Sequence, residues 1–440
     1  MKRKKTVLVL FSFFVMFNLS CSGGSGAGVP FFPLSPQASS SVSQQKPNDK
    51  TEDKTAPSKP VNNNPQPEKR FAEPITETKN PDPKTQFKSY EKMTRAIQLG
   101  DFDYLIKEYE AGGLKIAAIR SDTEFNDYPL DYTAKSIMQN IGQVGINNRN
   151  ISTINSEEKK AILDKIFKQV LIYSLKGSAN KLIENNRIGL IKEDKDTTDI
   201  ARHIFEYFYG NDDGSISANS IAKLSQTIDS SNAISSNKTY DSISSAIKQM
   251  KVNAKGNIKN LILGKNQIDK SFYKLLYLAT LEKIASTENM IKNKNTNAGN
   301  ELTAAEFLYI GIRNPSKVLF GKNNGYPETI FSNKRLDLLD YDKFVENINA
   351  GFNERVIEDM KHAMDTMITD NSSAQNFAFS AQLYLDITNC SYKNIGHSRV
   401  SNSQLTVNIQ NFKSAIQSKN SAKAKELFDK MGSALYWPGV

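Results

Sequence analysis

The spacing of apolar residues constrains this chain most, because it repeats with the period of an α-helix. Over residues 157–175, apolar side chains recur three and four positions apart, with Lys and Asp between them. That spacing is typical of an amphipathic helix with one buried face. The same pattern returns over 268–290 and 341–367, and no alternating strand pattern or strand–helix–strand rhythm accompanies it. The sequence therefore predicts an all-α fold of about a dozen helices.

Local signals place some of the helix ends. Ser156 has the character of an N-cap, and the two glutamates after it would lie in a first turn where the helix dipole favours acids. Gly177 is expected to end this helix, because glycine is common just beyond a helix C-terminus. Two short helix–turn–helix hairpins are predicted, over 90–111 and 412–431.

The N-terminus is different in character from this helical region. Residues 1–5 are cationic, residues 6–19 form an apolar run, and small residues surround Cys21. This order predicts a secretory signal peptide over 1–20, and the run is shorter than the roughly 20 residues that a membrane-spanning helix needs. With Cys21 at the cleavage point, the segment resembles a bacterial lipoprotein signal. The resemblance implies that Cys21 is lipidated and becomes the new N-terminus.

Residues 21–86 are predicted to form a disordered tether. Eleven of the fifteen prolines lie between Pro30 and Pro83, among Ser, Gln, Asn and Lys. Such a composition buries too little apolar surface to offset the entropy cost of ordering. A flexible coil of this length has a root-mean-square reach of roughly 40–50 Å. The helical domain is then expected over 87–440. The Asn- and Lys-rich stretch at 292–300 could divide it into two lobes or be only a surface loop.

The charge balance argues against a nucleic-acid partner. The formal net charge is +10, and removing the four cationic residues of the signal leaves +6. Spread over more than 400 residues, this charge is typical of a Lys-rich solvated surface and not of a concentrated basic face.

Catalytic motifs are scarce. The chain has three histidines, and neither metalloprotease, nucleophile-elbow, phosphate-loop nor paired-cysteine motifs occur. His203 and Glu206, like Asp359 and His362, lie one helical turn apart, a spacing that can supply two metal ligands. Because the bridging carboxylates of a di-iron bundle are missing, these residues are interpreted as polar pairs on helix surfaces. We predict no enzymatic activity, no resident metal and no cofactor.

One lysine-rich segment suggests a polyanion-binding surface. If residues 247–265 form one helix, four lysines spaced three and four apart share a face beside an apolar stripe. Such a row could bind a glycosaminoglycan, or it could be a set of lysines that flank a core-facing stripe. The four candidates are Lys248, Lys251, Lys255 and Lys259. Cys390 would have no intrachain partner once Cys21 is lipidated, and we expect it to be a buried, inert thiol.

The chain as a whole resembles surface lipoproteins of Borrelia-type spirochaetes. The resemblance lies in the Leu19-Ser20-Cys21 box, the glycines after it, the tether and the Lys-, Asn-, Ile- and Ser-rich helical body. Asn18 departs from the common bacterial box, and spirochaete boxes are looser. The resemblance implies a non-enzymatic protein of the outer membrane and cell surface that binds host molecules. Two alternatives stay open: a periplasm-facing envelope assembly protein, and an enzyme with an unrecognised helical site.

Overall fold

The computed structural model describes residues 82–435 except 126–128, 147, 190–193, 233, 235–236, 317–324 and 390–400. This part of the chain contains fifteen α-helices and two very short strands, so the all-α prediction is confirmed. The predictions for the signal, Cys21, most of the tether and Cys390 fall outside it. The elements are α1 (Pro83–Leu99), α2 (Phe102–Ala111), α3 (Gly113–Phe125), α4 (Leu130–Gln139), β1 (Gln143–Val144), β2 (Arg149–Asn150), α5 (Ser156–Arg187), α6 (Asp194–Tyr209), α7 (Ile221–Ser231), α8 (Thr239–Val252), α9 (Ile258–Lys292), α10 (Ala298–Tyr309), α11 (Tyr326–Phe331), α12 (Tyr341–Thr366), α13 (Asn371–Thr388), α14 (Asn402–Gln417) and α15 (Ser421–Leu435), with 3-10 turns at Ile151–Thr153, Ile310–Ile312, Ser332–Lys334 and Leu336–Leu338.

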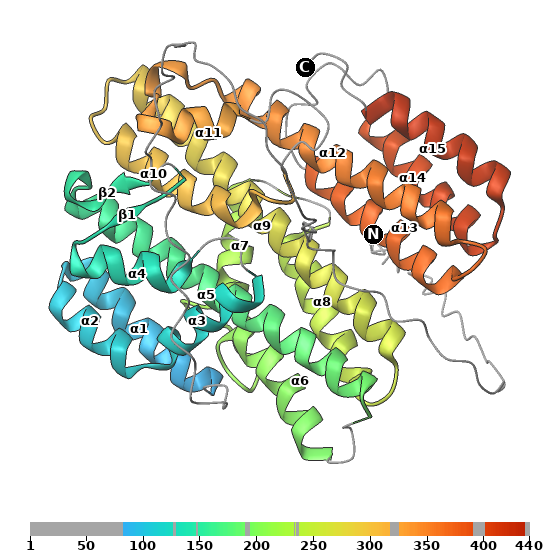
Figure 1. Cartoon of the computed structure of the whole chain (residues 1–440), viewed down its shortest axis with the longest axis horizontal. Helices are drawn as coiled ribbons and strands as arrows, with labels where there is room; N and C mark the ends of the chain where they lie inside the picture. The colour runs from blue at the N-terminus through green and yellow to red at the C-terminus, as the bar shows by residue number, and fades with distance from the viewer. Residues whose placement is uncertain are drawn as a thin grey trace, which may run out of the picture. The chain divides into compact units, whose positions relative to one another are not determined.

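Two long helices organise the fold. Helix α5 has 32 residues and α9 has 35, and the two pack against each other. Helices α1, α3, α4, α6 and α10 lie against α5, whereas α8, α10, α12 and α13 lie against α9 (Figure 1). A single cluster of buried apolar side chains extends from Phe87 in α1 to Leu435 in α15. The two long helices therefore join the N-terminal and C-terminal helices to one core.

The first of these helices extends further than its sequence predicts. Asn155, not Ser156, caps α5: its side chain accepts from the Glu158 amide, and the Glu158 carboxylate accepts from the Asn155 amide. The predicted stop at Gly177 is wrong. Leu175, Ala179 and Leu182 on either side of Gly177 are fully buried. That packing outweighs the roughly 1 kcal/mol that a glycine costs inside a helix.

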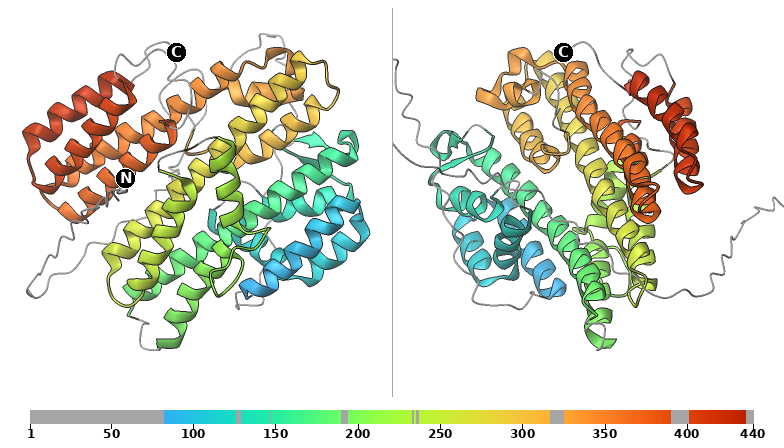
Figure 2. Two further views of the ribbon diagram at one scale, coloured as in Figure 1. Left: turned by 180° about the vertical axis from the view of Figure 1, so that it is seen from behind. Right: turned by 45° about the vertical axis from the view of Figure 1, so that its right-hand side comes forward.

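The predicted helical hairpins are both present. Helices α1 and α2 form the first, and α14 and α15 form the second. In both views of Figure 2, α14 and α15 lie at the edge of the fold, and their main contacts are with α12 and α13. The stretch at 292–300 includes the turn between α9 and α10, two helices that pack against each other. Helix α1 begins at Pro83, four residues before the expected start of the domain.

The two strands form a small hairpin that the sequence pattern does not predict. β1 and β2 pair antiparallel, with Gln143 opposite Asn150 and Val144 opposite Arg149. Arg149 reaches from β2 to α10, where its Nη2 donates to Glu306 Oε2 at 2.7 Å. A buried ion pair thus fastens the hairpin to the helical core.

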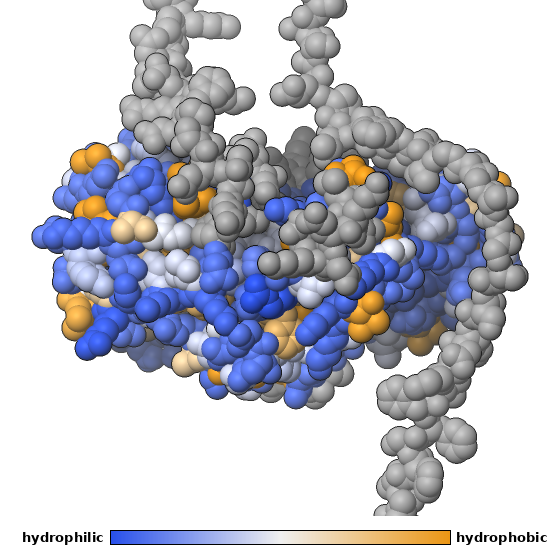
Figure 3. Space-filling model, turned by 90° about the horizontal axis from the view of Figure 1, so that it is seen from below, coloured by the Kyte–Doolittle hydropathy of each residue, from blue (hydrophilic) through white to orange (hydrophobic). Residues whose placement is uncertain are grey.

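The surface is mainly polar on the face shown in Figure 3, where hydrophobic residues appear as separate patches. Among the helices described, none combines the length and the apolar character that crossing a membrane requires.

Candidate functional site

A cleft of about 740 Å³ opens in the described domain. It is lined by side chains from α1, α3, α5, α6 and α9, with α5 contributing the longest stretch, from Tyr173 to Arg187. Ser174, Gly177 and Ser178 are small, so the surface of α5 is low at this point and leaves room beside it. The unexpected continuation of α5 through Gly177 is therefore what builds one wall of the cleft.

The cleft is basic. Arg120, Lys181, Arg187 and Lys265 line it, whereas Glu184 is the acidic residue of the lining. Lys265 pairs with Asp269 at 2.5 Å, and Arg187 lies 4.0 Å from Glu184. The ion pairs of the described residues include neither Arg120 nor Lys181, although both line the cleft. Their charges are available to an anionic group that enters the cleft.

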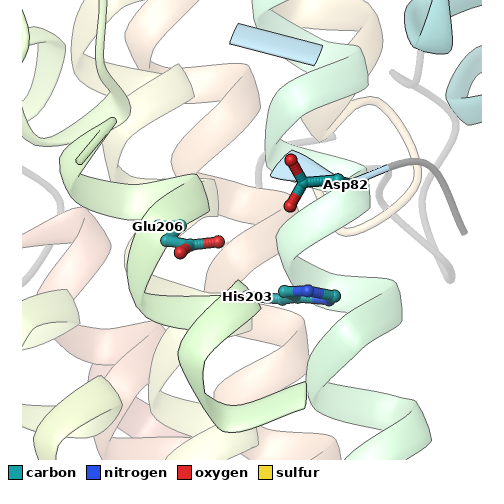
Figure 4. A group of neighbouring side chains, drawn as sticks. All are labelled: Asp82, His203 and Glu206. Atoms are coloured by element: carbon teal, nitrogen blue, oxygen red, sulfur yellow. The ribbon is translucent and has the colours of Figure 1, made fainter. Parts of the chain in front are cut away.

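A carboxylate–imidazole group lies beside the cleft. It consists of Asp82, which directly precedes α1, and of His203 and Glu206 in α6. One ligand atom from each lies within 4.8 Å of those of the other two, and the three side chains point toward a shared space (Figure 4). Tyr207 and Gln86, from the same two helices, line the cleft, whereas the three residues of the group do not.

Burial differs across this group. Glu206 is 1% exposed, His203 is half-buried and Asp82 is exposed. Burial raises the pKa of Glu206, and the negative charges of Asp82 and Asp212 act in the same direction while Arg202 opposes them. Burial and the charge of Arg202 lower the pKa of His203. Both shifts favour the neutral form of the side chain.

Glu206 lacks the partners that a buried carboxylate ordinarily has. Neither of its oxygens accepts a hydrogen bond. Its nearest cation is Arg202, whose Nη1 lies 3.6 Å from Oε1 and whose side chain is 45% exposed. The sequence-based interpretation of His203 and Glu206 as a polar pair on a helix surface is wrong for Glu206. Glu206 is buried on the side of α6 that meets Asp82, the residue before α1.

The second predicted pair does not gain a third ligand. His362 is exposed on α12, and its ring lies against Phe377 with 5.3 Å between ring centroids. Burial raises the pKa of Asp359, one turn away. In the described chain, no other carboxylate or imidazole converges on these two residues as Asp82 does on His203 and Glu206.

The four candidate lysines do not share one helix. α8 ends at Val252 and α9 begins at Ile258, so Lys255 lies in the turn between them. Gly256 in this turn has φ +103°, a conformation outside the helical range. All four lysines are exposed at the tip of this hairpin, but Lys251 lies over the Phe205 ring and Lys259 donates to Gln375. The expected apolar stripe is largely buried, with Ile247, Met250 and Leu261 in the core.

His203 and Glu206 are one helical turn apart in the sequence, a spacing that was interpreted as a surface polar pair and not as part of a three-residue group. The spacing of His203 and Glu206 was informative, but Asp82 is more than 100 positions away. Asp82 falls within the stretch that was assigned to the tether, and no local pattern connects it to α6. The cleft was also missed, because it depends on how α3 and α9 approach α5.

Comparisons with known proteins found no matching family model, no matching curated protein and no matching solved structure.

Proposed function

We propose that this chain is an exported bacterial lipoprotein, anchored in a membrane through lipid on Cys21, whose helical domain binds a partner and performs no catalysis. The observation that carries the proposal is the N-terminal order of a cationic start, a short apolar run and a cysteine. A cysteine at that position can hold acyl chains, and two or more chains give lasting membrane attachment where one is marginal.

The basic cleft supports binding as the role of the domain. It combines a volume of about 740 Å³ with two cationic side chains, Arg120 and Lys181, that form no ion pair within the described residues. An anionic group on a host molecule, such as a glycosaminoglycan or an acidic protein segment, has the complementary charge. The exposed lysines at the α8–α9 hairpin remain a second candidate surface for the same chemistry.

Lipidation is tested by metabolic labelling with an alkyne fatty acid in a bacterium that processes lipoproteins. We expect the full chain to be labelled and to sediment with membranes, and Cys21→Ser to lose both properties. Cys390→Ser is the matched control, because it removes the other thiol and leaves the signal intact. Label retained by Cys21→Ser would refute the anchor.

Orientation separates the two exported alternatives. Protease treatment of intact cells degrades a surface-displayed helical domain, whereas a periplasm-facing envelope protein is cut only after the outer membrane is opened. We propose the surface location, so protection of the domain in intact cells would favour the envelope assembly role instead.

Heparin retention then distinguishes the two candidate surfaces. If the cleft binds polyanions, Arg120→Gln with Lys181→Gln lowers the salt concentration needed for elution. The four hairpin lysines changed to Gln serve as the comparison, with twice as many charges removed. Equal retention of both variants and the unchanged chain would exclude polyanion binding at either surface.

A further inference from the structure

We propose that Asp82, His203 and Glu206 bind one divalent transition-metal ion of the Zn²⁺ class. Their ligand atoms lie within 4.8 Å of one another and point toward a shared space (Figure 4). One imidazole nitrogen and two carboxylate oxygens are a donor set that zinc accepts, with water able to complete a tetrahedral site. The proposal concerns the folded domain and does not depend on lipidation.

The state of Glu206 is the observation that points to a ligand. It is 1% exposed, and both of its oxygens lack a hydrogen-bond donor. In the described residues, no other buried carboxylate has both oxygens in this condition. A buried charged group is costly unless it is paired, hydrogen-bonded or coordinated to a metal. A cation between Glu206 and its two neighbours would supply the missing interaction.

Asp82 provides an independent argument. It occupies the N-cap position of α1, where an aspartate ordinarily accepts a hydrogen bond from an amide of the first turn. Its side chain makes no such bond, although the equivalent Asp101 of α2 and Asp340 of α12 do. The carboxylate of Asp82 instead faces His203 and Glu206 (Figure 4). The Asp82 side chain is therefore directed toward His203 and Glu206, and it does not cap α1.

The ligand spacing is compatible with coordination after small side-chain rotations. His203 and Glu206 are three positions apart on α6, so both project from one face of the helix. Zinc–ligand distances of about 2.1 Å place neighbouring ligand atoms about 3.4 Å apart in a tetrahedral site. The upper limit of 4.8 Å therefore has to shrink by somewhat more than 1 Å. Asp82 is exposed at the start of α1, where the backbone can follow the side chain.

Two cationic side chains near Glu206, Arg202 and Lys84, could compete with a metal ion for its carboxylate, but each also has another acidic partner. Arg202 lies 3.6 Å from Glu206, is 45% exposed and also pairs with Asp199 at 3.3 Å. Lys84 forms an ion pair with Asp212, with 2.5 Å between Nζ and Oδ2. Two carboxylates balance the charge of one divalent ion, so binding leaves no net buried charge.

The donor set also selects the kind of ion. Calcium and magnesium prefer sites made of oxygen ligands, whereas an imidazole favours zinc and its transition-metal neighbours. A bound ion would tie the residue that precedes α1 to α6. It would thereby fasten the start of the folded domain, on the side of the chain that leads to Cys21.

Calorimetric titration of the full-length chain with ZnCl₂, produced without a polyhistidine tag and carrying Cys390→Ser, tests the proposal. We expect one ion per chain. His203→Gln, Glu206→Gln and Asp82→Asn should each weaken binding by about tenfold or more. His362→Gln is the matched control, since His362 also lies one turn from a carboxylate and should leave the affinity unchanged. No binding up to about 1 mM Zn²⁺, or equal affinity in the triple variant, would overturn the site.

A thermal-unfolding series separates coordination from a merely structural role. In EDTA, Glu206→Gln should melt at or above the temperature of the unchanged chain, because the variant removes an unsatisfied buried carboxylate. Added Zn²⁺ should raise the melting temperature of the unchanged chain and of His362→Gln, but not that of Glu206→Gln. An equal rise in all three proteins would show that zinc acts elsewhere and would refute the assignment.

Discussion

Replacing Arg149 by Met should destabilise the domain strongly, because it removes the cation from a buried cluster. The Arg149 side chain is 11% exposed and Glu306 is 2% exposed, with 2.7 Å between Nη2 and Oε2. Nη1 also lies 3.6 Å from Glu158 and 3.5 Å from Thr303. Breaking a buried ion pair by removing one partner typically costs about 3–5 kcal/mol.

The contacts that remain set the size of the effect within that range. Glu158 keeps its ion pair with Lys334 and its hydrogen bond from Thr303. Within the described residues, Glu306 keeps the hydrogen bond from the Ile146 amide, at 2.8 Å. Removing Arg149 therefore leaves Glu306, more than Glu158, without a cationic partner. Protonation of Glu306 would remove its unpaired charge and so limit the destabilisation. We therefore expect Arg149→Met to lower the free energy of unfolding by about 3 kcal/mol at neutral pH.

Because Glu306 can be protonated, the destabilisation caused by Arg149→Met should depend on pH. Burial already raises the pKa of Glu306 above its unfolded value, although the charge of Arg149 opposes the rise. Without Arg149 the folded-state pKa rises further, so folded Glu306 holds its proton to a higher pH than the unfolded chain does. The resulting destabilisation grows as pH rises above the unfolded value, by up to about 1.4 kcal/mol per pH unit. The deficit of Arg149→Met should consequently be smaller at about pH 5 than at about pH 7.

Urea unfolding of the full chain, followed by far-ultraviolet circular dichroism, measures this deficit. Glu306→Gln and the double variant Arg149→Met with Glu306→Gln complete a double-mutant cycle. The double variant should lose less than the sum of the two single losses. Equal deficits at both pH values, or a double variant that loses the full sum, would refute the assignment of the cost to a buried unpaired carboxylate.

Three further changes test single features of the fold. Burial raises the pKa of Asp386 from 3.8 to about 6, so this carboxyl destabilises the fold increasingly as pH rises between those values. Asp386→Asn should therefore gain about 1 kcal/mol in urea unfolding at about pH 8 and almost nothing at about pH 4. Gly256→Ala meets no atom within 4 Å but keeps φ +103°, so backbone strain alone should cost about 1–2 kcal/mol, read as a lower melting temperature. Asn155→Ala removes the 2.9 Å capping bond from the Glu158 amide and should cost about 1 kcal/mol in the same assay.

Helical periodicity predicted the elements well where one face is buried along the whole segment. The prediction over 341–367 nearly coincides with α12, because its apolar positions all face the core. The errors in helix bounds are largest at two glycines. Gly177 lies inside α5, where surrounding packing decides, and Gly256 interrupts the segment that seemed to be one helix. A helix can continue through a glycine or end near it. Which of the two occurs at Gly177 and Gly256 depends on packing contacts with residues distant in sequence.

The alternation of polar and apolar residues could not predict the β-hairpin. Each of its strands has two residues, too few to show alternation. Gly142 and Gly145 have φ of +87° and +84°, and a Cβ on Gly145 would meet Glu306 Oε1 at 2.4 Å. The glycines were the available signal for a tight turn. Gly145 has a second role, close approach to the Glu306 carboxylate on α10, and this depends on a residue 161 positions further along the chain.

Glu206 differs from three other buried carboxylates of the fold in its lack of hydrogen-bond donors. Glu306 and Glu158 are as deeply buried, and each is supplied with a cation and hydrogen-bond donors from elements far apart in sequence. Asp269 is buried between Lys265 and Lys176. Each of these three carboxylates has at least one oxygen with a close donor, whereas both oxygens of Glu206 lack a hydrogen bond and the side chain faces His203 and Asp82. If the arrangement served stability alone, a nearby lysine or a glutamine at 206 would serve better, so the unsatisfied carboxylate is best explained as one prepared to bind a cation.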